Sequence, residues 1–256
     1  MIDPRAAVSP KAKLGANVTV GAFAVIGDEV EIGEGTWIGP HAVINGPSRL
    51  GRDNKVYQFA SLGDAPQDLK YKGEHTRLEI GDRNTFRECC TVNRGTVQDQ
   101  GVTRIGDDNL LMAYTHVAHD CKLGNKIVMS NLATLGGHVE IGDWAILGGL
   151  SAVHQYGKVG AHCFIANNTA VTRDVPPYVM AVGQPAEPHS VNSEGLKRRG
   201  FTEEQILNIR RAYKLLYRSG LKLAEAISQL EQAASTQPEL TSFVEFIKRS
   251  ERSIVR

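Results

Sequence analysis

Four of the eight histidines in this 256-residue chain fall within a single stretch of 39 residues. One of them, His119, is followed directly by Asp120. A neutral imidazole can remove a proton from a nucleophile at pH 7, and a neighbouring carboxylate can orient the ring and stabilise its protonated form. The pair therefore indicates general-base chemistry. The four clustered histidines are His116, His119, His138 and His154.

A zinc centre is the alternative interpretation of the same cluster, since several histidines beside an aspartate resemble a metal site with an open position. The chain has neither an HxH nor an HExxH spacing in this region. Three of its four cysteines fall at positions where a small apolar side chain is expected to point inward. We therefore expect no metal ion.

A six-residue repeat must position these residues. Aliphatic residues occupy every sixth position over residues 2–62 and again over 105–171, and a shorter run covers 80–92. A period of six matches neither an amphipathic helix nor a long strand, but it suits short strands separated by corners. The sequence therefore predicts a mainly β fold, a parallel β-helix with three strands and about 18 residues per coil.

Counting by 18 residues brings the candidate groups together. His119, Gly137 and Gln155 take equivalent positions on three successive coils, and Asp120 and His138 are likewise equivalent. Because neighbouring coils lie about 4.8 Å apart, His119 should reach the backbone of Gly137, and Asp120 should neighbour His138. All of them should lie on one edge.

Two insertions interrupt the repeat, at residues 64–79 and 96–104. Long loops in a compact domain usually carry function, so we expect both to project from the coil beside a site. The proline-rich stretch 174–188 is expected to end the solenoid and act as a linker. The β-helix with its loops is assigned to residues 1–190.

Residues 191–256 are predicted to form a C-terminal helical domain. Ser193 and Thr202 resemble N-caps, and Thr202 with Gln205 would form a capping box. This part carries 12 Lys+Arg against 8 Asp+Glu, whereas the rest carries 17 against 20. Such a basic cluster suits phosphates or an acidic partner, and a solvated helical face is the simpler alternative.

Composition excludes several classes of protein. The formal net charge is +1, and no aromatic platform accompanies the arginines, which argues against a nucleic-acid partner. No apolar run approaches the roughly 20 residues that span a bilayer, so we expect no membrane insertion. Four cysteines without a CxxC pair, behind an N-terminus without a signal sequence, predict free thiols and a cytoplasmic location.

Several longer motifs carry a resemblance to a known family. The chain resembles the UDP-N-acetylglucosamine O-acyltransferases of lipid A biosynthesis, hexapeptide-repeat enzymes whose parallel β-helix is left-handed. The resemblance covers nearly the whole chain, and its first and last motifs are its most specific. The motifs are QDLKYKG (67–73), HVAHD (116–120), GGHV (136–139), VHQ (153–155), DVPPYV (174–179) and EGLKRRGF (194–201).

The resemblance implies transfer of a 3-hydroxyacyl chain from acyl carrier protein to the glucosamine 3-hydroxyl of UDP-N-acetylglucosamine. His119 matches the family's general base, Asp120 would orient it, and Gly137 matches the backbone donor to the oxyanion. No cofactor is implied, since the thioester supplies the energy. The family works as a homotrimer with the site between adjacent subunits.

Substrate contacts are also implied residue by residue. Arg198 and its basic neighbours would face the acidic carrier protein, and Arg199 suits the diphosphate because its guanidinium donates in a fork. The residues that match contacts to the sugar, acyl donor or nucleotide are Gln67, Asp68, Lys70, His116, His138, His154, Gln155, Asn192, Glu194 and Arg199.

Two positions depart from the family pattern. Asn93 stands where many relatives have a histidine, in the string Asn93-Arg94-Gly95-Thr96. Asn167 stands where long-chain members have a glycine at the floor of the acyl groove. A side chain there should act as the acyl-chain ruler and favour a donor of roughly 10 to 12 carbons over the class with about 14.

Two other functions remain open at this stage. The same fold could acylate a nitrogen, on a 3-amino analogue of the nucleotide sugar, because one sequence does not reveal which acceptor atom is presented. A non-catalytic hexapeptide scaffold that only binds a partner is the second alternative. The paired His119 and Asp120 and the inserted loop at 64–79 favour the enzyme, since a scaffold needs neither.

Overall fold

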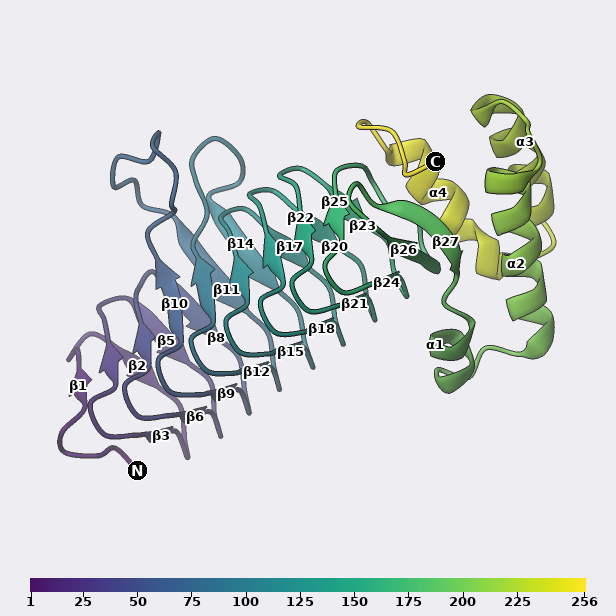
Figure 1. Cartoon of the computed structure of the whole chain (residues 1–256). Helices are drawn as coiled ribbons and strands as arrows, with labels where there is room; N and C mark the ends of the chain where they lie inside the picture. Colours follow the sequence, from purple (N-terminus) through teal and green to yellow (C-terminus); the bar gives the residue numbers. More distant parts are fainter.

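The chain forms a three-sided coil that rises from the N-terminus and ends beneath a group of helices (Figure 1). The structure is a computed structural model that describes residues 1–256. Short strands from successive coils pair into three sheets of 9, 8 and 10 strands, here called sheets I, II and III. All pairings are parallel except the last one, between β26 and β27.

Each sheet takes every third strand of the coil. Sheet I contains β1 (Ala7–Val8), β4 (Val25–Ile26), β7 (Val43–Ile44), β10 (Ser61–Asp64), β13 (Thr91–Asn93), β16 (His116–Val117), β19 (Thr134–Leu135), β22 (Ala152–Val153) and β25 (Ala170–Val171). Sheet II contains β2 (Lys13–Leu14), β5 (Val30–Ile32), β8 (Ser48–Leu50), β11 (Arg77–Ile80), β14 (Val102–Ile105), β17 (Lys122–Leu123), β20 (Glu140–Ile141) and β23 (Lys158–Val159). Sheet III contains β3 (Thr19–Val20), β6 (Trp37–Ile38), β9 (Lys55–Val56), β12 (Thr85–Phe86), β15 (Leu110–Leu111), β18 (Val128–Met129), β21 (Ile146–Leu147), β24 (Phe164–Ile165), β26 (Val179–Val182) and β27 (Glu187–Val191).

The six-residue repeat builds the core as predicted. Within most strands the first residue points outward and the second points into the prism, where stacked coils bury it completely, as at Ile44 and Leu62. The first coil is the exception: Ile2 is 48% exposed and Val8 and Leu14 are only partly buried, because no coil lies beneath them. Burial of one aliphatic side chain per strand replaces the long amphipathic elements of ordinary domains.

Buried asparagines fix the register along the corner between sheets II and III. The side chains of Asn54, Asn84 and Asn109 are essentially inaccessible to solvent. The backbone N–H of Asn84 donates to Asn54 Oδ1 at 2.9 Å, and that of Asn109 donates to Asn84 Oδ1 at 2.9 Å. Each amide also donates to a glycine carbonyl of the following coil. Since unpaired buried amides are costly, a slip of one residue would break every link.

Both insertions leave the coil at the corner between sheets I and II, called here the I–II corner. Figure 1 shows them projecting from the same edge. They span residues 65–76 and 94–101, slightly different from the predicted 64–79 and 96–104, because Arg77–Ile80 and Val102–Ile105 already pair within sheet II. The coil closes normally around each insertion, and β13 still pairs with β16.

The proline-rich stretch at 174–188 is not a linker, contrary to prediction. Val175 bridges to Val159, and β26 pairs in parallel with β24, so the coil continues to Val182. The side chains of Val175, Val179 and Ala181 are buried. The prolines form a corner of an additional partial coil, a role that a proline pattern does not distinguish from a chain break.

The helices pack on the last coil. Helix α1 is capped by the side chain of Asn192, which accepts from the N–H of Gly195, so the predicted cap at Ser193 lies one residue too late. The capping box of Thr202 with Gln205 is confirmed. No helix has the length and apolarity needed to span a membrane. The helices are α1 (Ser193–Arg198), α2 (Glu203–Arg218), α3 (Leu223–Ala234), the short 3₁₀ helix η1 (Pro238–Leu240) and α4 (Thr241–Arg249).

The C-terminal tail returns to the coil after α4. Asp174 accepts from the hydroxyl of Ser250 at 2.6 Å and from the backbone of Lys158 at 2.9 Å. The N–H of Val255 donates to the carbonyl of Asp174 at 2.8 Å, and Ile254 is buried. This return places the tail beside the later coils.

Candidate active site

The His119 ring lies directly against Gly137 of the next coil. A Cβ atom built on Gly137 would come within 2.7 Å of His119 Nε2 and 2.6 Å of its Cε1, so any other residue there would displace the His119 ring. The carbonyl of His119 accepts from the N–H of His138 at 3.0 Å, which locks the two corners together. The N–H of Gly137 makes no hydrogen bond within the chain. The predicted register is confirmed, and an imidazole nitrogen and an available amide share one small space.

Asp120 holds His119 from behind. Its side chain is 1% exposed, and its Oδ2 lies 2.9 Å from Nδ1 of His119. Thr96 donates to the same carboxylate through its N–H at 2.9 Å and its hydroxyl at 2.6 Å. Burial alone would raise the pKa of Asp120, but the hydrogen bonds from His119 and Thr96 outweigh it and lower that pKa. An ionised carboxylate only accepts, so the proton lies on Nδ1 and the Nε2 lone pair faces Gly137.

His116 lies on the outward side of β16. Its Nδ1 is 2.8 Å from the hydroxyl of Thr91 on the preceding coil. Burial, and to a smaller extent the neighbouring His119, lower the pKa of His116. The ring is therefore neutral at pH 7, which suits a hydrogen-bonding contact rather than a charge.

The first inserted loop carries three predicted contact residues, Gln67, Asp68 and Lys70. Asp68 accepts from the backbone N–H of Lys70 at 3.0 Å, which makes a tight turn at the loop tip. Arg94, at the start of the second insertion, donates to the hydroxyl of Tyr71 at 2.9 Å and to the carbonyl of Gly63. The two loops are thus tied together on the His119 edge. Sequence reasoning missed this contact because Arg94 and Tyr71 are separated by 23 residues.

His154 and Gln155 belong to the same corner, one coil above Gly137. His154 Nδ1 lies 3.0 Å from the carbonyl of Gln155. Arg252, on the C-terminal tail, donates to that carbonyl and lies 3.4 Å from the same His154 nitrogen. A tail residue at this edge had no signal in the sequence, because it depends on the return of the chain after α4.

The predicted nucleotide contacts of the helical part lie elsewhere within one chain. Arg199 packs over Trp144 at 5.2 Å, and its guanidinium donates to His162 Nδ1 at 3.1 Å, on the corner between sheets II and III. Asn192 donates to the carbonyl of His162 at 3.0 Å. Glu194 and Arg198 sit on α1, beside this corner. A single chain therefore does not bring these four residues to His119.

The environment of His162 explains how Arg199 is held. Burial, followed by the charge of Arg199, lowers the pKa of His162 to about 4. Its neutral ring stacks between Trp144 and Tyr178 and keeps a lone pair on Nδ1 for the guanidinium. Burial also lowers the pKa of Arg199 from its usual value. The stack presents Arg199 in a fixed orientation.

The two departures from the family pattern have distinct surroundings. Asn93 is 4% exposed, and its Oδ1 has no hydrogen-bond partner. Asn167 lies on the corner between sheets III and I, where its Oδ1 accepts from the N–H of Gly149 at 2.9 Å. Sheet I separates Asn167 from His119, and its outward residues there are small, such as Thr134 and Ala152.

The ligating atoms of His119, Asp120 and His138 lie within 4.8 Å of one another, which is close enough for a metal ion. However, both oxygens of Asp120 already accept hydrogen bonds, from Thr96 and His119. A metal would have to displace those bonds. The donor set fits a histidine held by a carboxylate better than a zinc centre.

A histidine paired with a buried carboxylate and placed against a glycine amide, on a coil of hexapeptide repeats, is the arrangement expected of a hexapeptide-repeat acyltransferase. Residues 174–255 match a family model described as UDP N-acetylglucosamine O-acyltransferase, domain 2. The chain belongs to the UDP-N-acetylglucosamine acyltransferase family, and its coil is the left-handed parallel β-helix of that family.

Solved structures support this assignment over the full chain. LpxA from Acinetobacter baumannii is 43% identical, with a TM-score of 0.97 and coverage of 100% of this chain and 99% of that one. The Francisella novicida UDP-N-acetylglucosamine acyltransferase is 43% identical, with a TM-score of 0.99 and coverage of 100% and 94%. The Arabidopsis enzyme is 32% identical, with a TM-score of 0.85 and complete coverage of both chains.

The lowered pKa of His162 predicts a pH dependence of stability. Between the unfolded pKa of about 6.5 and the folded pKa of about 4, the unfolded chain binds more protons than the folded chain. Stability should therefore fall as pH drops through this window, and the full loss should be present below about pH 4. Solvent screening at this half-buried ring limits the effect to roughly 1–2 kcal/mol.

A His162→Phe variant keeps a ring for the stack but removes the titrating group. We expect it to flatten the slope of the unfolding free energy against pH between pH 5 and 6.5, measured by urea denaturation. Trp144→Phe is a matched control, because it changes a neighbour in the same stack and removes no titrating group, and it should keep the wild-type slope. Equal slopes in His162→Phe and the wild type would contradict the assignment.

Proposed function

We propose that this chain transfers a 3-hydroxyacyl group from acyl carrier protein to the 3-hydroxyl of the glucosamine in UDP-N-acetylglucosamine, the first step of lipid A biosynthesis. The observation that carries the proposal is the contact between His119 and Gly137. A base and an oxyanion donor within one space are what acyl transfer to an alcohol requires.

The chemistry can be assigned to atoms. His119 Nε2 takes the proton of the sugar hydroxyl as its oxygen attacks the thioester carbonyl, and Asp120 stabilises the imidazolium that forms. The N–H of Gly137 donates to the oxyanion of the tetrahedral intermediate. Collapse breaks the carbon–sulfur bond, and the departing thiol takes the proton from His119. The product is an oxygen ester, and no cofactor takes part.

A basic groove beside α2 supports an acidic carrier as the donor. It encloses about 660 Å³ between β27 and the helices. Its lining includes several cations and only one acid, Glu194. Acyl carrier proteins are acidic, so charge complementarity would steer their approach. The basic residues of the groove are His189, Arg210, Arg211, Lys214 and Arg218.

The outward faces of the three sheets support a homotrimer. Sheet II carries charges along its whole length, such as Glu31, Arg104 and Lys158. Sheets I and III instead present mostly small and apolar residues. The corner between sheets III and I adds an exposed apolar ridge, and ridges of this kind mark interfaces. Sheet I of one copy against sheet III of the next, closed after three copies, would cover both faces. The ridge residues are Phe23, Phe59, Tyr114, Leu132 and Leu150.

Such a trimer would resolve the separation of the site residues. The I–II corner of His119 borders sheet I, and the corner of Arg199 borders sheet III. If those two sheets meet between copies, Arg199, Asn192 and Glu194 of one copy can approach His119 of its neighbour. The four free cysteines fit the reducing cytoplasm as the place of assembly.

The direct test is an assay with UDP-N-acetylglucosamine and a 3-hydroxyacyl acyl carrier protein. We expect an ester product, and His119→Ala should lower kcat/KM by roughly 10²-fold or more, because the general base is lost. Lys13→Ala, which removes an exposed side chain at the N-terminal end of sheet II, remote from His119, should leave activity unchanged. Acylation only of the 3-amino analogue would favour the amine acceptor, and full activity in His119→Ala would favour a silent scaffold.

The second test concerns Asn167. Donors of roughly 10 to 12 carbons should be used better than those of about 14, and Asn167→Gly should shift the preference toward the longer chain by about tenfold. The neighbouring change Asn168→Gly should leave the preference where it was. A wild-type enzyme that prefers the donor of about 14 carbons would refute Asn167 as the ruler.

The third test concerns assembly. Light scattering should give a mass near three times 27.9 kDa. Leu150→Lys places a charge on the apolar ridge and should release smaller species, whereas Glu31→Lys on the charged face should not. A wild-type mass near 27.9 kDa would overturn the trimer.

A further inference from the structure

The ring of His138 is enclosed on four sides at the I–II corner. Tyr156 stacks on one face, with ring centroids 4.3 Å apart and an interplanar angle of 7°. His119 meets the ring edge-on at 5.1 Å and 90°. Asp120 Oδ2 lies 3.8 Å from Nε2, and Asp99 Oδ2 lies 3.3 Å from Nδ1. Only 10% of the side chain is exposed.

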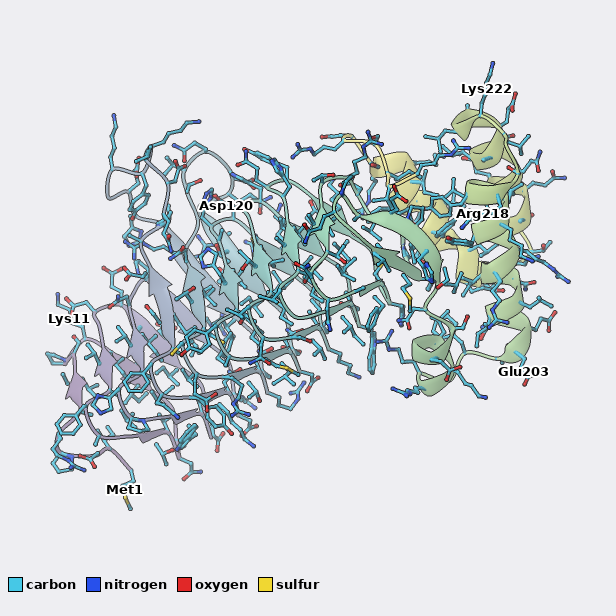
Figure 2. The ribbon with its side chains drawn as sticks, in the orientation of Figure 1. Met1, Lys11, Asp120, Glu203, Arg218 and Lys222 are labelled. Carbon is cyan, nitrogen blue, oxygen red and sulfur yellow. The ribbon has the colours of Figure 1, made fainter.

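Asp99 reaches this ring from the second inserted loop. The loop is a tight turn in which the N–H of Gly101 donates to the carbonyl of Thr96 at 3.0 Å. Thr96 is itself anchored on Asp120 by two hydrogen bonds. The first residue of this turn, Thr96, therefore binds Asp120, and Asp99, three residues later, contacts His138. Figure 2 labels Asp120 close to this projecting loop.

We propose that Asp99 is a positioning residue that fixes the orientation and tautomer of His138. Asp99 lies within hydrogen-bonding distance of Nδ1, whereas Asp120 lies 3.8 Å from Nε2 and already accepts from Thr96 and His119. A carboxylate accepts but does not donate, so the closer carboxylate favours the proton on Nδ1 and leaves Nε2 turned toward Asp120 and the site. A half-turn of the ring about its bond to Cβ would keep the stack on Tyr156 but carry Nδ1 away from Asp99, so the loop carboxylate is the group that distinguishes the two ring orientations. The chain thus has two imidazole–carboxylate pairs side by side, His119 with Asp120 and His138 with Asp99.

The second pair also acts on the oxyanion donor. His138 follows Gly137 directly and adopts a left-handed backbone conformation, with φ of 62°. Holding its side chain from the loop holds this corner, and with it the direction of the Gly137 N–H. Asp99 therefore influences acyl transfer without touching a substrate. The inference rests on the proposed function for its activity readout.

The experiment compares Asp99→Ala and Asp99→Asn with Gln98→Ala, an exposed neighbour on the same loop. We expect Asp99→Ala to lower kcat/KM by about tenfold and Asp99→Asn, which keeps an accepting oxygen, by about threefold. Gln98→Ala should match the wild type. Thermal unfolding should stay within about 1 °C for all three variants, because Asp99 lies on an exposed loop.

A double-mutant cycle separates positioning from a general effect on the loop. If Asp99 acts through the ring, Asp99→Ala should change activity by less than about twofold in a His138→Ala background. A full tenfold loss in that background, or an Asp99→Ala variant as active as the wild type, overturns the proposal.

A nitrogen NMR spectrum of the imidazole gives a readout that does not need turnover. His138 should show a protonated Nδ1 in the wild type and a mixture of tautomers in Asp99→Ala. Inactivity of the wild-type enzyme with the proposed substrates would refute the proposed function. The NMR measurement would still test whether Asp99 sets the tautomer of His138. An unchanged tautomer in Asp99→Ala would refute the positioning role by itself.

Discussion

Lateral stacking of identical coils is the constraint on which the site depends. Strand pairing fixes one rung spacing along the whole prism, so residues 18 apart in sequence become neighbours in space wherever no insertion intervenes. That is how an imidazole at His119 meets a backbone amide at Gly137 without a loop or hinge between them. The asparagines inside the opposite corner hold the register, so the distance between the His119 ring and the Gly137 amide is set by the core. The site inherits the rigidity of the prism, as preorganised catalysis requires.

The sequence predicts whatever follows from this spacing. The inward aliphatic positions and the edge shared by His119, Gly137 and Gln155 both follow from counting by six. The repeat spacing does not predict contacts that form only where the chain folds back on itself. Asp99 reaches His138 only because an insertion turns tightly over Thr96, and Arg252 reaches Gln155 only because the tail returns after α4. The stretch around Val175 was wrongly predicted as a linker for a related reason: prolines are common both in the corners of a coil and at the end of a repeat.

Burial and hydrogen bonding have opposite effects on the pKa of the Asp120 carboxyl. Desolvation by itself would favour the protonated acid, which would no longer hold the imidazole in the useful tautomer. Thr96 supplies two donors, so the anion remains stable where water is excluded. The second insertion therefore supplies the donors that keep Asp120 ionised beside His119, the proposed general base.

The placement of both insertions at one corner has a structural cause. A corner tolerates extra residues because the strands on either side still pair with the coils above and below, whereas an extra residue inside a strand would turn its inward side chain outward. Two of the three corners, I–II and II–III, lie between an apolar face and the charged face of sheet II. Loops at the I–II corner can lean over sheet I, where a neighbouring copy would sit in the proposed trimer, and still leave an opening toward solvent for a carrier protein. The II–III corner carries no insertion, so of the two corners beside the charged face only I–II combines His119 with projecting loops.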